Sequence, residues 1–229
     1  MSFENPLDAG ELAELIEEIH AADSPAETAE QVIKCLCEML EMDQAGVTMI
    51  RGGGRLETVS ATGDEVYRAD ELQMTLAEGP LFSEDWDQTL RSGDLANDRR
   101  WPLWAKEVTD LGFASLLSVS LAPESHRIGA VSLYSTEPRF FDDDDAALAH
   151  IFARHAAIAL VTAEKEEHLQ IALDARKLIG QAQGILMERF DLDEPRAFAV
   201  LRRYSQNHNL KLREVARQLV ETRRLPPVL

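Results

Sequence analysis

Apolar residues in the first part of the chain recur first at helical spacing and then at strand spacing. The pattern predicts a helix over 11–21 and a second helix that begins at Pro25, with Ser24 as its N-cap. Residues 44–50 and 56–61 read as two strands joined by three glycines. No Gly-Lys-Ser/Thr sequence follows these glycines, so they predict a hairpin turn and not a phosphate-binding loop.

The middle of the chain predicts three short amphipathic helices and two buried strands. The helices are expected over 64–74, 83–91 and 101–111, the second of them capped by a serine. Residues 115–121 and 128–134 are apolar and contain small side chains, which is typical of central strands in an antiparallel sheet. No βαβ repeat is visible, so a doubly wound parallel sheet is not expected.

Everything after Asp142 is predicted to be helical. Residues suited to a parallel coiled-coil seam recur at intervals of three and four: Leu148, Ile151, Phe152, His155, Ile158, Ala159, Thr162, Leu169, Ala172, Leu173 and Ile179. If this helix runs unbroken from Asp143 to Phe190, it is too long to bury its apolar stripe against one small domain. Dimerisation is the simplest way to cover that stripe.

A compact three-helix unit is expected at the end of the chain. Asp193 is the predicted cap of its second helix, whose inner face is expected to carry Ala197, Phe198, Leu201 and Tyr204. The third helix is expected to turn Leu212, Val215, Ala216 and Leu219 inward.

Charge is distributed unevenly along the chain. Of its 229 residues, 45% are hydrophobic and 28% charged, as in ordinary globular proteins, and the net charge is −18. Residues 171–229 carry eleven Lys and Arg against seven Asp and Glu, a net charge of +4, which leaves −22 on the rest. This asymmetry suggests a basic effector module on an acidic body, although basic side chains on solvated helix faces are an equally good explanation.

Nothing in the sequence indicates secretion, a membrane or catalysis. Cys35 and Cys37 point in different directions on a predicted helix, so a structural disulfide between them is not expected, and the apolar stretch 156–161 is too short to cross a bilayer. We therefore expect a soluble, cytoplasmic protein without a signal peptide. The motifs of hydrolases, metalloproteases and nucleotide-binding enzymes are absent, and the carboxylates of Asp142–Asp145 lack further ligands for a metal. We expect no enzyme activity, no catalytic residues and no metal site.

A binding surface is the better prediction for the basic tail. Arg176, Gly180, Gln183 and Gly184 share one face of the long helix. Glycine inside a helix costs about 0.5–1 kcal/mol relative to alanine, so two of them favour either a closely approaching ligand or close helix packing. Guanidinium and amide groups around the next turn can contact phosphates and unstacked bases of an RNA loop. The candidate residues there are Arg202, Arg203, Ser205, Asn209, Lys211 and Arg213.

The last sixty residues resemble an ANTAR domain. Residues 176–187 are similar to the first-helix signature of that family, and the later matches keep its order and spacing: Leu192, Ala197-Phe198, Leu201-Arg202, Ser205, Asn209, Lys211-Leu212 and Val215-Ala216. The resemblance implies an RNA-binding transcription antiterminator that recognises paired stem-loops as a dimer. The family usually has Lys where Gln183 stands, which removes one cation from the implied RNA face.

Residues from about 11 to 160 resemble a GAF sensor domain. The similar segments are Glu78-Gly79-Pro80, Asp98-Arg99-Arg100-Trp101-Pro102, Gly112-Phe113-Ala114-Ser115 and Gly129-Ala130-Val131-Ser132-Leu133-Tyr134. The resemblance implies a six-stranded antiparallel sheet with a pocket for a small molecule, lined by Arg99 and Trp101. Alternatively, Trp101 simply covers the sheet as core. Leu81 stands where related sensors often have Cys, which argues against thiol sensing there.

These observations predict an α+β protein with a GAF-like antiparallel sheet and flanking helices, a long connecting coiled-coil helix and an ANTAR-like three-helix unit. The expected domains are 1–160 for the sensor and 161–229 for the linker helix and RNA-binding unit. The expected function is signal-responsive antitermination by a homodimer that binds RNA stem-loops, with the sensed ligand and any cofactor unknown. Two alternatives remain: a DNA-binding helix-turn-helix regulator with a GAF sensor, and a scaffold that binds only protein.

Overall fold

The computed structural model describes residues 9–42, 44–83, 89–123 and 126–225. The chain divides into two compact units, Met1–Glu164 and Lys165–Leu229. The first unit contains the strands β1 (Gln44–Arg51), β2 (Arg55–Ala61), β3 (Leu90–Ser92), β4 (Ser115–Leu121) and β5 (Gly129–Ser135). Its helices are α1 (Ala9–His20), α2 (Pro25–Met39), α3 (Asp64–Leu76), α4 (Pro102–Asp110) and the first part of α5 (Asp143–Phe190).

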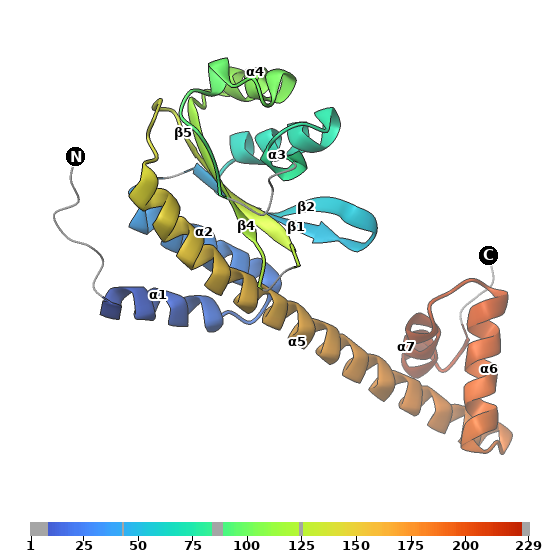
Figure 1. The fold of residues 1–229 in the computed structure, drawn as a ribbon. Helices are drawn as coiled ribbons and strands as arrows, with labels where there is room; N and C mark the ends of the chain where they lie inside the picture. Colours follow the sequence, from blue (N-terminus) through green and yellow to red (C-terminus); the bar gives the residue numbers. More distant parts are fainter. Residues whose placement is uncertain (1–8, 43, 84–88, 124–125, 226–229) are drawn as a thin grey trace. The chain divides into compact units, whose positions relative to one another are not determined.

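The first unit is a sheet covered by helices on both faces (Figure 1). The strand order is β2-β1-β5-β4-β3, and every neighbouring pair is antiparallel. Side chains alternate between the two faces, as pleated strands require. Val47, Val131 and Val119 belong to the core under α1, α2 and α5, whereas Leu116 and Tyr134 belong to the core under α3 and α4.

Most predicted elements of this unit are confirmed. The Ser24 hydroxyl accepts a hydrogen bond from the Glu27 backbone N–H at 3.2 Å, so the predicted cap begins α2. The three glycines 52–54 connect β1 to β2 as a hairpin, with positive φ at Gly53 and Gly54. The two strongly apolar segments form β4 and β5, and β5 is the central strand of the sheet.

The helix predicted over 83–91 is wrong at its end. Residues 84–88 lie outside the described part of the chain, but Leu90 and Arg91 belong to the edge strand β3, which pairs with β4. A three-residue strand has too few positions to show an alternating pattern, and pairing with β4 decides its conformation. The described residues form five strands, one fewer than the resemblance to GAF domains implies.

The helix α5 is continuous from Asp143 to Phe190. By length and composition alone, this helix is long and apolar enough to cross a membrane, because one window of 18 residues in it has a mean hydropathy of 1.5. However, 44% of that window is buried inside the protein. Phe152, Ala156 and Leu160 lie fully buried in the core against the sheet. Packing against the sheet therefore accounts for the apolar character of this part of the helix.

The second unit consists of the end of α5 with α6 (Glu194–Asn207) and α7 (Leu212–Thr222). Asp193 accepts a hydrogen bond from the Arg196 backbone N–H at 2.9 Å, which confirms it as the cap of α6. The buried core comprises Ala182, Leu186, Ala197, Leu201, Val215, Ala216 and Leu219. The prediction that Phe198 belongs to this core is wrong, because its side chain is 36% exposed and lies outside the cluster.

We predict that Gly129→Ala strongly destabilises the first unit. A Cβ at Gly129 would overlap the carbonyl oxygen of Thr48 on the paired strand β1 and lie 3.1 Å from the Met49 Cα. The two strands would have to separate, at a cost of about 1–3 kcal/mol or more. Urea denaturation measures this loss. Gly52→Ala is the matched control, because its Cβ would meet nothing within 4 Å; equal stability of the two variants would contradict the prediction.

Candidate functional site

Gly180 and Gly184 lie exposed on α5, and close packing inside the unit does not explain them. A Cβ at either position would meet no atom within 4 Å beyond its own stretch of helix. The alternative of close helix packing within this unit is therefore not supported by the structure. The two glycines leave a stretch of helix backbone open to a molecule outside the unit.

Gln183 connects α5 to α6. Its Nε2 donates a hydrogen bond to the Glu194 carbonyl oxygen at 3.3 Å, next to the capped start of α6. At this position a lysine would add a charge, whereas the glutamine amide contributes to the junction between the two helices. The side chain is half-buried, so it also remains accessible from a groove beside it.

Ser205 and Asn209 build the turn between α6 and α7. The Ser205 hydroxyl donates to the Leu210 carbonyl oxygen at 2.6 Å, and Asn209 adopts a left-handed conformation with φ 51°. Lys211 and Arg213 follow directly and are exposed at the start of α7. Ser205 therefore positions the turn that presents these two cations.

Several predicted cations form no ion pair with another residue in the described part of the chain. Among the described residues of the second unit, the ion pairs are Arg196 with Asp193 and Arg217 with Glu214. The exposed cations outside these pairs include the five predicted to contact RNA: Arg176, Arg202, Arg203, Lys211 and Arg213. Charges that are not neutralised within the protein are available to phosphates.

A groove of about 740 Å³ lies between α5 and α6. Its lining residues are Ala172, Ala175, Arg176, Ile179 and Gln183 from α5 and Glu194, Pro195 and Phe198 from α6. Of the predicted site residues, this groove brings together Arg176 and Gln183. Arg213 instead lines a groove between α5 and α7, and Gly184 lines another between the same helices. The predicted residues are thus spread over three grooves, the turn between α6 and α7, and the exposed surfaces of α5 (Gly180) and α6 (Arg202 and Arg203), instead of lining one pocket.

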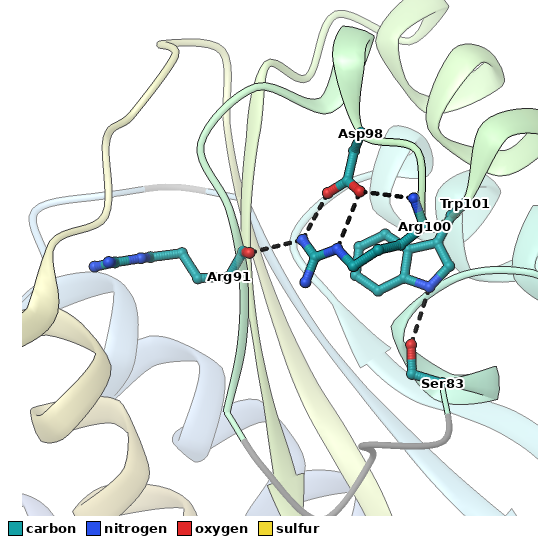
Figure 2. A network of polar contacts seen from close by, with 5 residues as sticks. All are labelled: Ser83, Arg91, Asp98, Arg100 and Trp101. Atoms are coloured by element: carbon teal, nitrogen blue, oxygen red, sulfur yellow. Dashed lines mark hydrogen bonds and ion pairs between the residues drawn. The ribbon is translucent and has the colours of Figure 1, made fainter.

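In the first unit, Arg100 is held over Trp101 by a set of polar contacts (Figure 2). Its Nε and Nη2 donate to the two carboxylate oxygens of Asp98 at 3.0 and 2.6 Å, and Nη2 also donates to the Arg91 carbonyl oxygen at 2.8 Å. The guanidinium carbon lies 4.4 Å from the centre of the Trp101 ring. Burial raises the pKa of Asp98, but hydrogen bonds from Arg100 and Ser92 outweigh it and lower the pKa overall.

The two residues predicted to line a ligand pocket occupy different environments. Trp101 is buried, packs edge-on against Trp104 and donates from Nε1 to the Ser83 hydroxyl at 2.9 Å. Arg99 is exposed. Trp101 therefore behaves as core that covers the sheet, the alternative weighed from the sequence, and Arg100 is the arginine that contacts it.

Asp70 is a fully buried carboxyl that sequence reasoning missed. Its Oδ2 accepts hydrogen bonds from the hydroxyls of Thr48 at 2.8 Å and Thr58 at 3.0 Å, and its Oδ1 accepts from Gln73 at 3.3 Å and Tyr134 at 3.4 Å. Burial outweighs these bonds and raises its pKa to about 6. The sequence signal that could have revealed this buried carboxyl is the position of Asp70 next to Ala69, on the buried face of α3.

Ion pairs connect the sheet to the first part of α5. Arg91 of β3 lies 2.7 Å from the Asp143 carboxylate at the start of the helix. At the end of β1, Arg51 pairs with Glu164 and with Glu57, to which its Nε donates at 2.6 Å. The hydrogen bond and charge of Arg51 lower the pKa of Glu57. Thus β3 contacts the first residue of α5, and β1 contacts the last residue of α5 that belongs to this unit.

Two family models match the chain. A GAF domain matches residues 22–161, and an ANTAR domain matches residues 167–220. No curated protein matches the chain significantly.

Solved structures share the fold of the first unit. The GAF domain of a phosphoenolpyruvate-protein phosphotransferase from Coxiella burnetii aligns with a TM-score of 0.56 at 16% identity, covering 69% of this chain and 94% of that one. The corresponding domain from Acinetobacter gives 0.55 at 10%, with the same coverage. The GAF domain of the cyanobacteriochrome TePixJ gives 0.53 at 14%, covering 64% of this chain and 94% of that one.

We predict that Asp70 makes the stability of the first unit depend on pH. Its carboxyl has a pKa of about 6 when folded, against an ordinary value of 3.8. The stability that it contributes is therefore complete below about pH 4 and is lost as the pH rises through about 6, a change of up to about 3 kcal/mol. Asp70→Asn stays neutral and should not show this loss.

Urea denaturation at several pH values measures the difference between this variant and the wild type. The unfolding free energy of Asp70→Asn relative to wild type should rise between pH 4 and 7. The exposed Asp110→Asn serves as control and should show no such trend. A difference for Asp70→Asn that stays constant over this range would contradict the prediction.

Proposed function

We propose that this chain, which belongs to the GAF domain family and carries an ANTAR domain at residues 167–220, is a signal-responsive RNA-binding regulator that acts by transcription antitermination. It is a cytoplasmic protein without enzyme activity, and its sensor unit receives the signal, for which a small-molecule ligand is one candidate. The RNA-binding surface is formed by the second unit.

The observation that carries this proposal is a set of exposed cations on the ANTAR unit that form no ion pair with another described residue. Arg202, Arg203, Lys211 and Arg213 are exposed along α6 and the start of α7. Cationic side chains of this kind release counterions from phosphates on binding, which favours nucleic acid over a protein partner. The bare backbone at Gly180 and Gly184 supports close approach by the RNA.

The active form in this proposal is a homodimer held by a coiled coil of α5. Ile151, Ile158, Leu169 and Leu173 are exposed and recur at spacings of seven, eleven and four along one helix. A second copy in parallel covers this stripe and brings two ANTAR units to one RNA. Paired units fit an RNA with two stem-loops.

The signal passes from sensor to RNA-binding unit through α5. The ion pairs of Arg51 with Glu164 and of Arg91 with Asp143 connect strands of the sheet to this helix. A shift of the sheet between two states changes the pairing of the two α5 helices and hence the spacing of the RNA-binding units.

We predict that the double variant Leu169→Glu, Leu173→Glu is monomeric. The two side chains are 63% and 54% exposed, so the change introduces repulsion in the coiled coil without removing core residues. Sedimentation velocity measures the mass of the particle. Ile171→Glu is the matched control, because Ile171 is 44% exposed but faces another side of the helix. A dimeric double variant, or a monomeric wild type, would contradict the proposal.

We predict that Lys211→Ala, Arg213→Ala weakens binding to a two-hairpin RNA. If each cation contacts one phosphate, the two chains of the dimer together lose about four phosphate contacts, and the magnitude of the slope of log affinity against log salt falls by about 2.8 to 3.6. Electrophoretic mobility shift at several salt concentrations gives both affinity and slope. Arg196→Ala, Arg217→Ala removes the same charge from ion-paired positions and should change the slope less.

The same experiment separates the alternatives. Tighter retention of duplex DNA than of hairpin RNA would favour the helix-turn-helix regulator. Absence of any nucleic-acid binding at low salt would exclude the proposal and favour a scaffold that binds protein.

A further inference from the structure

Phe198 is an aromatic side chain that lies outside the core of the ANTAR unit. It lies on α6 directly after the fully buried Ala197, yet it is 36% exposed and outside the core cluster. A single exposed apolar residue is ordinary on a protein surface. Phe198 differs because it lines the groove between α5 and α6, together with Ile179 and Pro195.

Polar groups of three chemical kinds line the same groove. Arg176 contributes a guanidinium, Gln183 an amide and Glu194 a carboxylate. The Gln183 amide is held in place by its hydrogen bond to the Glu194 carbonyl oxygen. Along α6, Arg202 follows Phe198 by four residues, so a second exposed cation lies on the same side of this helix.

This combination of an aromatic ring with amide and charged groups favours a nucleotide as the ligand of the groove. An apolar helix of another protein would bury the charges of Arg176 and Glu194 without partners, which is costly. A nucleotide has a flat face that stacks on an aromatic ring, base edges that pair with amide and carboxylate groups, and a phosphate for the flanking cations. The volume of about 740 Å³ is ample for a base.

We propose that this groove binds one unstacked nucleobase from an RNA loop, stacked on Phe198, with Arg176 contacting the adjoining phosphate. This inference rests on the proposed RNA-binding function and assigns to it a site for base recognition. Lys211 and Arg213 then contribute affinity by contacting phosphates, whereas Phe198 makes binding depend on an unstacked base in the RNA loop.

The test measures binding of full-length protein to a fluorescent two-hairpin RNA. Phe198→Ala should weaken binding about 5- to 160-fold for each hairpin contact, the range expected from loss of one base–aromatic stack. Phe198→Tyr should restore most of the affinity because it keeps the ring. Val200→Ala is the matched control, since Val200 is 38% exposed on another side of the same helix and should leave affinity unchanged.

A second readout reports stacking directly. 2-Aminopurine is placed at each loop position in turn, and its fluorescence is recorded with the RNA saturated by protein. One position should be quenched by wild type and Phe198→Tyr but not by Phe198→Ala. Removing the base at that position should weaken wild-type binding and leave Phe198→Ala unaffected.

The outcomes separate this inference from the proposed function. If wild type binds hairpin RNA and Phe198→Ala binds equally well, the nucleobase site is excluded while RNA binding stands. If wild type binds no RNA, the proposed function itself fails. If Phe198→Ala converts a dimer to a monomer by sedimentation, the groove is an interface between copies and the nucleobase assignment is overturned.

Discussion

Burial of the apolar residues of α5 is the constraint on which the other features depend. This one helix supplies Phe152, Ala156 and Leu160 to the core against the sheet, and Ala182 and Leu186 to the core of the ANTAR unit. Between these two stretches, leucine side chains remain exposed. The hydrophobic effect favours covering them, and under the proposed function a second copy of the helix does so.

The core between the sheet and α3 contains buried polar side chains as well as apolar ones. A bulge after Val47 brings Thr48 opposite Thr58, and both hydroxyls reach Asp70 on the face covered by α3. Burying an ionised carboxyl whose hydrogen-bond donors are all neutral costs folding free energy. On the same side of the sheet, Arg100 covers Trp101. The core under α3 and α4 thus combines apolar side chains with a buried carboxyl and its hydrogen-bond donors.

Local signals predicted much of the fold and less of the site. The caps Ser24 and Asp193 and the strands β4 and β5 follow from short-range patterns, and the structure confirms them. The strand β3 could not be predicted, because its conformation comes from pairing with β4. The partners of Asp70 lie far from it in sequence, and the exposure of Phe198 depends on how α5 and α6 pack. Such features arise from tertiary contacts, which periodicity does not encode.

The proposed function requires that two joined ANTAR units recognise paired RNA stem-loops. It is tested most directly by comparing wild-type binding to an RNA with two hairpins and to each hairpin alone, with stoichiometry from native mass spectrometry. Two linked units should bind the two-hairpin RNA as two protein chains per RNA, and tens of times more tightly than either single hairpin, because the second contact becomes intramolecular. Equal affinity for one and two hairpins, or one chain per RNA, would contradict the account.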